Sequence, residues 1–217
     1  MLILNCTKAA AELFTPTKKG KKSIPIQPDP NFSILDSEYQ GQPLSQWLIH
    51  TKKINRKNIL IIMHIPTRFS MVFCNLKKGE WDKVIQLMLE RLANAMLDVD
   101  DMIDKEDEAL FQFTLANFID THRQFEFFQR SDKSVLGHIA DVFDLFELEL
   151  QDIGYLPNHQ EEGAGFDEFA NQTIRSTGLR PKGFYPEAEM YVEWLTRYGG
   201  VDESQAEHIR YLVIKSI

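Results

Sequence analysis

Two histidines are the side chains of this sequence best suited to chemistry. His64 lies near the end of the apolar run "NILIIMHI", and His50 lies in the alternating segment "WLIHTKKI" that precedes it. If the chain turns about Arg56, position 64 lies opposite position 48, and His50 is a diagonal neighbour of His64. Two imidazoles at that distance suit a divalent metal or a general base, but no third ligand follows at a typical spacing. The alternative is that His64 is a hydrogen-bonded histidine at the end of a strand.

A second set of residues is suited to binding a small anion. The segment "SDKSVLG" starts a predicted helix with Lys133 and Ser134, and Arg130 comes just before it. A helix N-terminus attracts anions, so we expect these residues to hold a phosphate or another small anion. Arg56 and Arg68 flank the neighbouring predicted strands and would add positive charge. The glycine-rich loop of nucleotide-binding proteins is missing, and basic hairpin tips are often only solvated.

Two further patterns have simpler structural interpretations. Ser134, His138 and Asp141 resemble a catalytic triad, but three positions on one helix do not place the acid across the imidazole from the nucleophile. The acidic run "DVDDMIDKEDE" (98–108) lacks the glycine and the final glutamate of a calcium loop. We expect it to be a solvated connection that places negative charge at the start of the next helix. No spacing is typical of a metal site, and we expect neither a metal ion nor a cofactor.

The composition indicates an ordinary globular protein. The chain has 217 residues, of which 43% are hydrophobic and 26% charged, enough for one domain with a substantial core. The net charge of -8 argues against general nucleic-acid binding, which needs a basic surface. No apolar run is long enough to span a membrane. Two cysteines, Cys6 and Cys74, without a metal-ligand spacing or an export signal predict reduced thiols in a cytoplasmic protein.

The elements that must position these residues can be predicted from periodicity. We expect strands at 1–6, 47–54, 58–65, 68–75 and 124–130, and helices from 7, 81, 106, 131, 186 and 202. The short connections between the three middle strands predict hairpins, and the helix at 106–120 is apolar nearly all round and should be buried. The fold class is therefore α+β, an antiparallel meander of about three to five strands packed with helices.

The chain divides into two parts. Residues 1–155 form the α+β core, interrupted by a long Pro- and Lys-rich loop at 15–43 that includes "KKGKK". Residues 156–217 add a loop, up to about residue 183, and a helical C-terminal extension that packs on the core. An apolar patch on the segment "EAEMYVEWLTRY" (187–198) would favour a protein partner or a homodimer.

Three patches of this sequence resemble a bacterial family known as domain of unknown function 6933. They are "MLILNCTKAAAEL" at the N-terminus, Trp47 followed by "INRKNILIIMHIPTRFSMVF", and "SDKSVLGHIADV", which together span roughly residues 1–150. The chain departs from the family pattern at Met63-His64, where a polar turn is usual, and at Asn58, where a cysteine is usual. The resemblance implies a cytoplasmic bacterial protein of the kind found among accessory or mobile genes. It implies no activity.

These observations lead to one expected function and two alternatives. We expect a protein that acts by binding, either to a protein partner or to a small anionic ligand. The first alternative is a hydrolase or nuclease that uses His50, His64 and acids brought together by folding. The second is nucleic-acid binding through "KKGKK" and the basic hairpin near Arg56, which the net charge does not favour.

Overall fold

The structure is a computed structural model that describes residues 1–217 except 16, 19–20, 23–24, 104–106 and 158. Its helices are α1 (Lys8–Phe14), α2 (Trp81–Met102), α3 (Glu108–Thr121), α4 (Lys133–Ile153), α5 (Gln160–Asn171), α6 (Pro186–Gly199) and α7 (Glu203–Ser216). Its main sheet contains β1 (Leu2–Cys6), β4 (Ile26–Gln27), β7 (Ser45–Ile54), β8 (Lys57–His64), β9 (Ser70–Phe73) and β10 (Phe125–Gln129). Short hairpins are formed by β2 (Thr17–Lys18) with β3 (Lys21–Lys22), β5 (Glu38–Tyr39) with β6 (Gln42–Pro43), and β11 (Arg175–Thr177) with β12 (Arg180–Phe184).

The main sheet is mixed, which corrects the expectation of a purely antiparallel sheet. Its strand order is β4–β10–β1–β7–β8–β9, and β1 pairs in parallel with both β7 and β10. The antiparallel meander is confirmed only for β7, β8 and β9. Parallel pairing requires long connections, and the segments 7–44 and 74–124 supply them. β1 is buried along its whole length and all of its residues except Asn5 are apolar, which is typical of such a strand.

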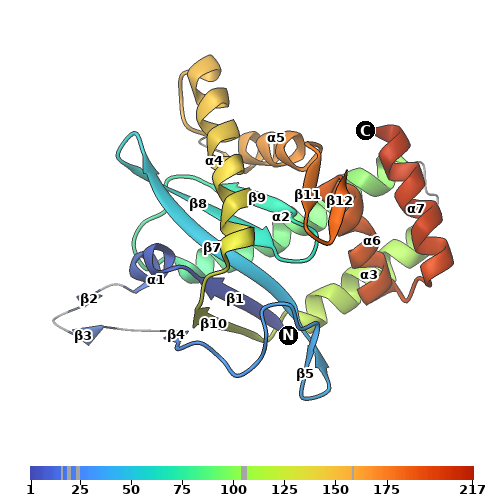
Figure 1. Ribbon diagram of the computed structural model, residues 1–217, viewed down its shortest axis with the longest axis horizontal. Coiled ribbons are helices and arrows are strands. Elements are labelled where there is room, and N and C mark those ends of the chain that lie inside the picture. Colours follow the sequence, from blue (N-terminus) through green and yellow to red (C-terminus); the bar gives the residue numbers. More distant parts are fainter. Residues whose placement is uncertain (16, 19–20, 23–24, 104–106, 158) are drawn as a thin grey trace.

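Helices cover both faces of the sheet (Figure 1). One face packs against α1, α2, α3, α6 and α7, and its core includes Leu4, Trp47 and Ile62. The other face packs against α4 and α5 through Leu48, Ile61 and their neighbours. We call these the α2 face and the α4 face. Cys6 belongs to the α2 face and Cys74 packs against the α4 face, so the sheet separates the two free thiols.

The β7–β8 turn sets the register of the meander. Asn55 and Arg56 both have positive φ, 49° and 65°, which makes a two-residue turn that fits the twist of a hairpin. Ile54 therefore pairs with Lys57, and His64 pairs with Trp47. The expected turn contained one residue more, so the predicted pairing of position 64 with position 48 is wrong by one residue. A slip of one residue moves a side chain to the other face of the sheet.

The prediction for the C-terminal part is partly confirmed. Pro186 begins α6, Gly200 ends it with φ 71°, and Asp202 caps α7 with a complete capping box. The segment 156–183 was expected to be a loop, but it contains α5 and the β11–β12 hairpin. The apolar residues of α6 do not form a surface patch, because Met190, Trp194 and most of their neighbours are buried in the core.

For helices α2, α3 and α4 the structure confirms part of the prediction and corrects part of it. Helix α4 buries one apolar stripe, and Gly154 ends the helix with φ 81°. The stripe consists of Val135, Ile139, Val142, Phe143, Phe146 and Leu150. Asp107 caps α3 as the acidic run predicted, although Asp98 and Asp100 belong to the last turns of α2. The expectation that α3 is buried all round is wrong, because Phe113 and Ile119 are more than half exposed.

Side chains from α5 and α2 complete the open edge of the sheet at β9. The amide of Asn171 accepts from the Ser70 N–H and donates to the Ser70 carbonyl, both at 2.8 Å. Asp167 accepts from the Val72 N–H at 2.8 Å, and Arg91 donates to the Val72 carbonyl at 2.7 Å. Residues four apart on a helix thus replace the neighbouring strand, which protects an edge that would otherwise present unpaired backbone groups.

This edge clamp, formed by Arg91, Asp167 and Asn171, depends on close packing of α2 and α5. Arg91 also forms a buried ion pair with Asp167, and its guanidinium lies 4.6 Å from the ring centroid of Phe73. A Cβ atom at Gly163 would lie 3.1 Å from an Arg91 nitrogen, so the glycine allows the helices to approach.

Removing the Asn171 amide should destabilise the fold, because two buried backbone groups of Ser70 lose their partners. We predict that Asn171→Ala lowers the free energy of unfolding by about 2–4 kcal/mol. Urea denaturation measures this change. The control Asn31→Ala, at an exposed position, should change the free energy of unfolding by no more than about 0.5 kcal/mol. A loss below about 1 kcal/mol in Asn171→Ala would contradict the clamp.

Candidate functional site

His64 and His50 lie on opposite faces of the sheet. His64 pairs with Trp47 on the α2 face, whereas His50 pairs with Ile61 on the α4 face. The imidazole of His50 bonds to the hydroxyl of Thr7 at 2.9 Å. The expected two-histidine site is therefore absent, because the register differs by one residue from the predicted one.

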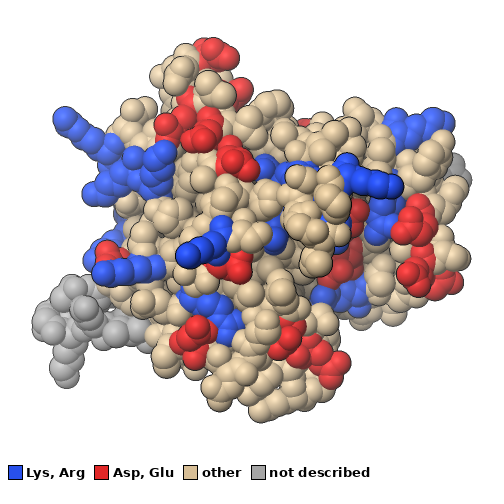
Figure 2. Space-filling model, viewed as in Figure 1, with Lys and Arg blue, Asp and Glu red and all other residues tan. Residues whose placement is uncertain are grey.

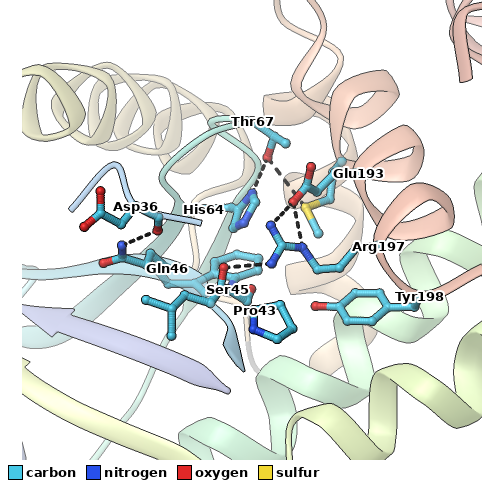
Figure 3. Close-up of polar contacts among 12 residues, drawn as sticks. Asp36, Pro43, Ser45, Gln46, His64, Thr67, Glu193, Arg197 and Tyr198 are labelled. Carbon is cyan, nitrogen blue, oxygen red and sulfur yellow. Dashed lines mark hydrogen bonds and ion pairs between the residues drawn. The ribbon is translucent and has the colours of Figure 1, made fainter. Parts of the chain in front are cut away.

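His64 is a buried structural histidine. Its Nδ1 atom lies 2.9 Å from the hydroxyl of Thr67, and its ring centroid lies 4.8 Å from that of Trp47 (Figure 3). Burial lowers its pKa well below the ordinary value, and Arg197 adds to the effect. Arg197 itself donates to Glu193 and, at 2.8 Å, to the Leu44 carbonyl. The interpretation as a hydrogen-bonded histidine at a strand end fits this geometry.

A second buried histidine ends a chain of hydrogen bonds whose direction is fixed. The Nδ1–H of His122 donates to the Phe118 carbonyl at 2.8 Å, so its Nε2 accepts from the hydroxyl of Tyr198 at 3.3 Å. Each donor has one acceptor only if the imidazole of His122 is neutral. Burial lowers its pKa to about 4, which keeps it neutral.

The candidate anion-binding residues do not all come together. Arg56 is exposed at the β7–β8 tip, where Figure 2 shows a gathering of Lys and Arg. Lys52 in β7 and Lys57 in β8 are also exposed. Arg130 turns away from the start of α4 and binds the segment 29–32, forming an ion pair with Asp29 and donating to the Phe32 carbonyl at 2.5 Å. Lys133 is exposed at the first turn of α4.

Arg68 and Ser134 do meet, at the N-terminus of α4. A guanidinium nitrogen of Arg68 lies 3.4 Å from the Ser134 hydroxyl, and Arg68 is only 7% exposed. Arg175 from β11 is 5% exposed and lies 3.9 Å from the carboxylate of Asp141. Burial lowers the pKa of His138, and Arg68 and Arg175 lower it further. Of the candidate anion-binding residues, Arg68 and Ser134 therefore lie together, and Arg175 adds positive charge from the C-terminal part.

A cavity of about 420 Å³ lies between α2 and α5, next to the edge clamp. Arg91, Asp167 and Asn171 form part of its wall, and Phe69 and Met71 from the α2 face of the sheet contribute apolar surface. Its other lining residues are Asn94, Ala95, Asp98, Val99, Met102, Gln160, Glu161, Ala164, Gly165, Glu168, Gln172 and Glu187. Concave, partly apolar sites with a few polar groups are typical of small-molecule binding.

Two buried carboxyl groups in this cavity have raised pKa values. Burial raises the pKa of Asp167, and Arg91 and the Val72 N–H counteract that rise. Burial raises the pKa of Glu187 to about 7, and Glu168 and Asp98 add to the effect. A pKa strongly shifted by burial in a cleft marks a candidate functional group.

The sequence offered little signal for this cavity. Arg91 and Asp167 are 76 positions apart, on two helices. The only local signal is the four-residue spacing of Asp167 and Asn171 in "GFDEFANQ". That segment was expected to be part of a loop, because glycines at 163 and 165 interrupt any helical pattern.

The described residues contain no group of three or more His, Cys, Asp or Glu side chains placed to hold a metal ion. No helix within the described part of the chain is long and apolar enough to cross a membrane.

Comparison with known proteins identifies one family. The family described as domain of unknown function (DUF6933) matches residues 3–189. The chain belongs to this family. The match extends past residue 150, to which the resemblance was traced, so the DUF6933 region includes the edge clamp and both walls of the cavity. No curated protein and no solved structure matches the chain.

The buried histidine His122 makes stability depend on pH. The unfolded chain protonates this imidazole near its ordinary pKa of 6.5, whereas the folded protein does so only near 4. We predict that its contribution is complete above pH 6.5 and is lost as the pH falls toward 4, by about 3 kcal/mol. Urea denaturation across this range measures the slope.

The matched variants for this measurement are His122→Gln and His208→Gln. The first should reduce the slope by the contribution of His122, leave that of buried His64, and lower stability at pH 7. The second, at an exposed position, should change neither the slope nor the stability. An unchanged slope in His122→Gln would contradict the assignment.

Proposed function

We propose that this member of the DUF6933 family acts by binding a small organic ligand in the cavity between α2 and α5. The observation that carries the proposal is a cavity of about 420 Å³ that combines apolar surface with buried carboxyl groups. Its volume suits a small organic molecule. The buried carboxyl groups are costly to desolvate, and a ligand that hydrogen-bonds to them would offset part of that cost.

We favour a small ligand over a protein partner or a homodimer because the surface expected for a partner is missing. The apolar residues of α6 face the core. Hydrolysis through His50 and His64 is not part of this proposal, because the two side chains lie on opposite faces of the sheet. We also propose a cytoplasmic protein of a bacterial accessory gene. The free thiols of Cys6 and Cys74 support the cytoplasmic location.

A small anion at the N-terminus of α4 is the second candidate. It is supported by two buried arginines, Arg68 and Arg175, whose Nε atoms have no hydrogen-bond partner among the described residues. Asp132 and Asp141 neutralise part of this charge, since each raises the pKa of a neighbouring arginine. We place this site second because charge within the cluster is already partly compensated.

A cavity-blocking variant tests the proposal. Ala164 is an exposed residue of α5 that lines the cavity, and Ala116 is an exposed residue of α3 outside its lining. We predict that a ligand found in a thermal-shift screen of small amines, alcohols and carboxylates raises the melting temperature of the native protein and of Ala116→Trp, but not of Ala164→Trp. A ligand present at a hundred times its Kd stabilises by about 2.7 kcal/mol.

Two results would contradict the proposal. One is a screen in which no compound stabilises the native protein. The other is stabilisation that persists in Ala164→Trp, which would place the ligand elsewhere, for example at the start of α4. Arg68→Gln would then test that second candidate.

A further inference from the structure

The charged residues of the cavity are nearly all acidic. Of the side chains that line it, five are carboxylates and one is an arginine. The carboxylates are Asp98 from α2, Glu161, Asp167 and Glu168 from α5, and Glu187 from α6.

The single arginine is already engaged. Arg91 forms the ion pair with Asp167 and donates to the Val72 carbonyl, and these contacts hold its guanidinium against β9. It therefore neutralises one carboxylate and leaves the rest of the cavity with negative charge.

Among the remaining acids of the cavity, Glu187 is buried. It is only 6% exposed, and its carboxylate accepts from the Gln172 amide at 3.1 Å. No Lys, Arg or His among the described residues lies within ion-pair distance of it. A buried carboxylate without a cation of its own is costly, and a cation that enters the cavity and pairs with it would offset that cost.

Apolar side chains of the same cavity limit the kind of cation. Met71 lies in β9, and Phe69 lies in the turn that precedes this strand. Val99 and Met102 lie in the last turns of α2. A bare metal ion would make no contact with these apolar side chains. No three potential metal ligands among the described residues lie close enough together to hold one.

We propose that the ligand of this cavity is an organic ammonium ion with an apolar body, whose charged nitrogen binds the Glu187 carboxylate. This inference rests on the proposed function and adds the chemical class of the ligand. The ammonium donates hydrogen bonds to carboxylate oxygens, and its apolar body packs on Phe69 and Met71. Charge-assisted hydrogen bonds of this kind are stronger than neutral ones.

The same geometry couples binding to a proton. Glu187 faces Asp98 from α2, Glu168 from α5 and Gln172, which directly follows α5. Burial beside these acids raises the pKa of Glu187 to about 7. An ammonium ion binds the charged form, so binding below pH 7 releases a proton. Affinity should therefore rise with pH up to about 7 and level off above it.

The test is isothermal titration of the native protein with benzylamine, benzyl alcohol and benzoate, which share a ring and differ in charge. We expect benzylamine to bind at least about tenfold more tightly than the other two, a difference of about 1.4 kcal/mol. Its affinity should fall between pH 7 and pH 5.5, and the heat should depend on the buffer because a proton is released.

Two glutamates of the same cavity provide matched variants. Glu187→Gln should weaken benzylamine binding at least about tenfold and remove its pH dependence, with benzyl alcohol unaffected. Glu161→Gln removes the same charge at an exposed position and should have a much smaller effect. The binding of benzyl alcohol to Glu187→Gln also shows that this variant is folded.

The outcomes separate this inference from the proposed function. Benzoate or benzyl alcohol binding as tightly as benzylamine, with loss in Ala164→Trp, would overturn the ammonium assignment and leave the cavity as the binding site. Equal effects of Glu187→Gln and Glu161→Gln would also overturn it. If none of the three probes binds at millimolar concentration and the wider screen finds no ligand sensitive to Ala164→Trp, both proposals fail.

Discussion

The edge of β9 is the constraint on which the rest of the structure depends. The free backbone groups of an outer strand must be paired or covered. Here three side chains form the hydrogen bonds that a further strand would have formed. The side-chain amide of Asn171 has the same donor and acceptor as a peptide group, so it satisfies both polar atoms of Ser70. At Val72 the two roles are divided between Asp167 and Arg91. Four residues along a helix rise about 6 Å, close to the spacing of alternate residues in a strand.

The cavity is a consequence of this arrangement. The clamp fixes α5 against the edge of the sheet and draws in Arg91 from α2, which packs closely at Gly163, yet a cavity remains between the two helices. The space between them receives Glu187 from the first turn of α6. Because Arg91 is committed to holding the edge, the cavity retains the negative charge of the other acids. The requirement to close a sheet edge thus produces both the shape and the electrostatics of the proposed site.

Local patterns predicted the elements that depend on local physics. The hairpins between the three middle strands and the helix starts at Thr7 and Asp202 are confirmed. The parallel pairing of β1 with β7 and β10 depends on long-range packing, and no local pattern distinguishes it. The register of β7 and β8 depended on whether the turn has two or three residues, a choice that the positive φ of Arg56 decides. The same limit applies to the site: the contact of Arg68 with Ser134 joins residues 66 positions apart, and the cavity needs residues from α2, α5 and α6.

Native-state hydrogen exchange of the Ser70 and Val72 amides tests the central claim most directly. These N–H groups point to the outside of the sheet, and their only partners among the described residues are the side chains of Asn171 and Asp167. If those side chains complete the sheet, both amides exchange only through large-scale unfolding, as slowly as amides of the central strands β1 and β8. Exchange at the rates of a frayed, exposed strand edge would contradict the clamp, and with it the position of α5 and the wall of the proposed binding site.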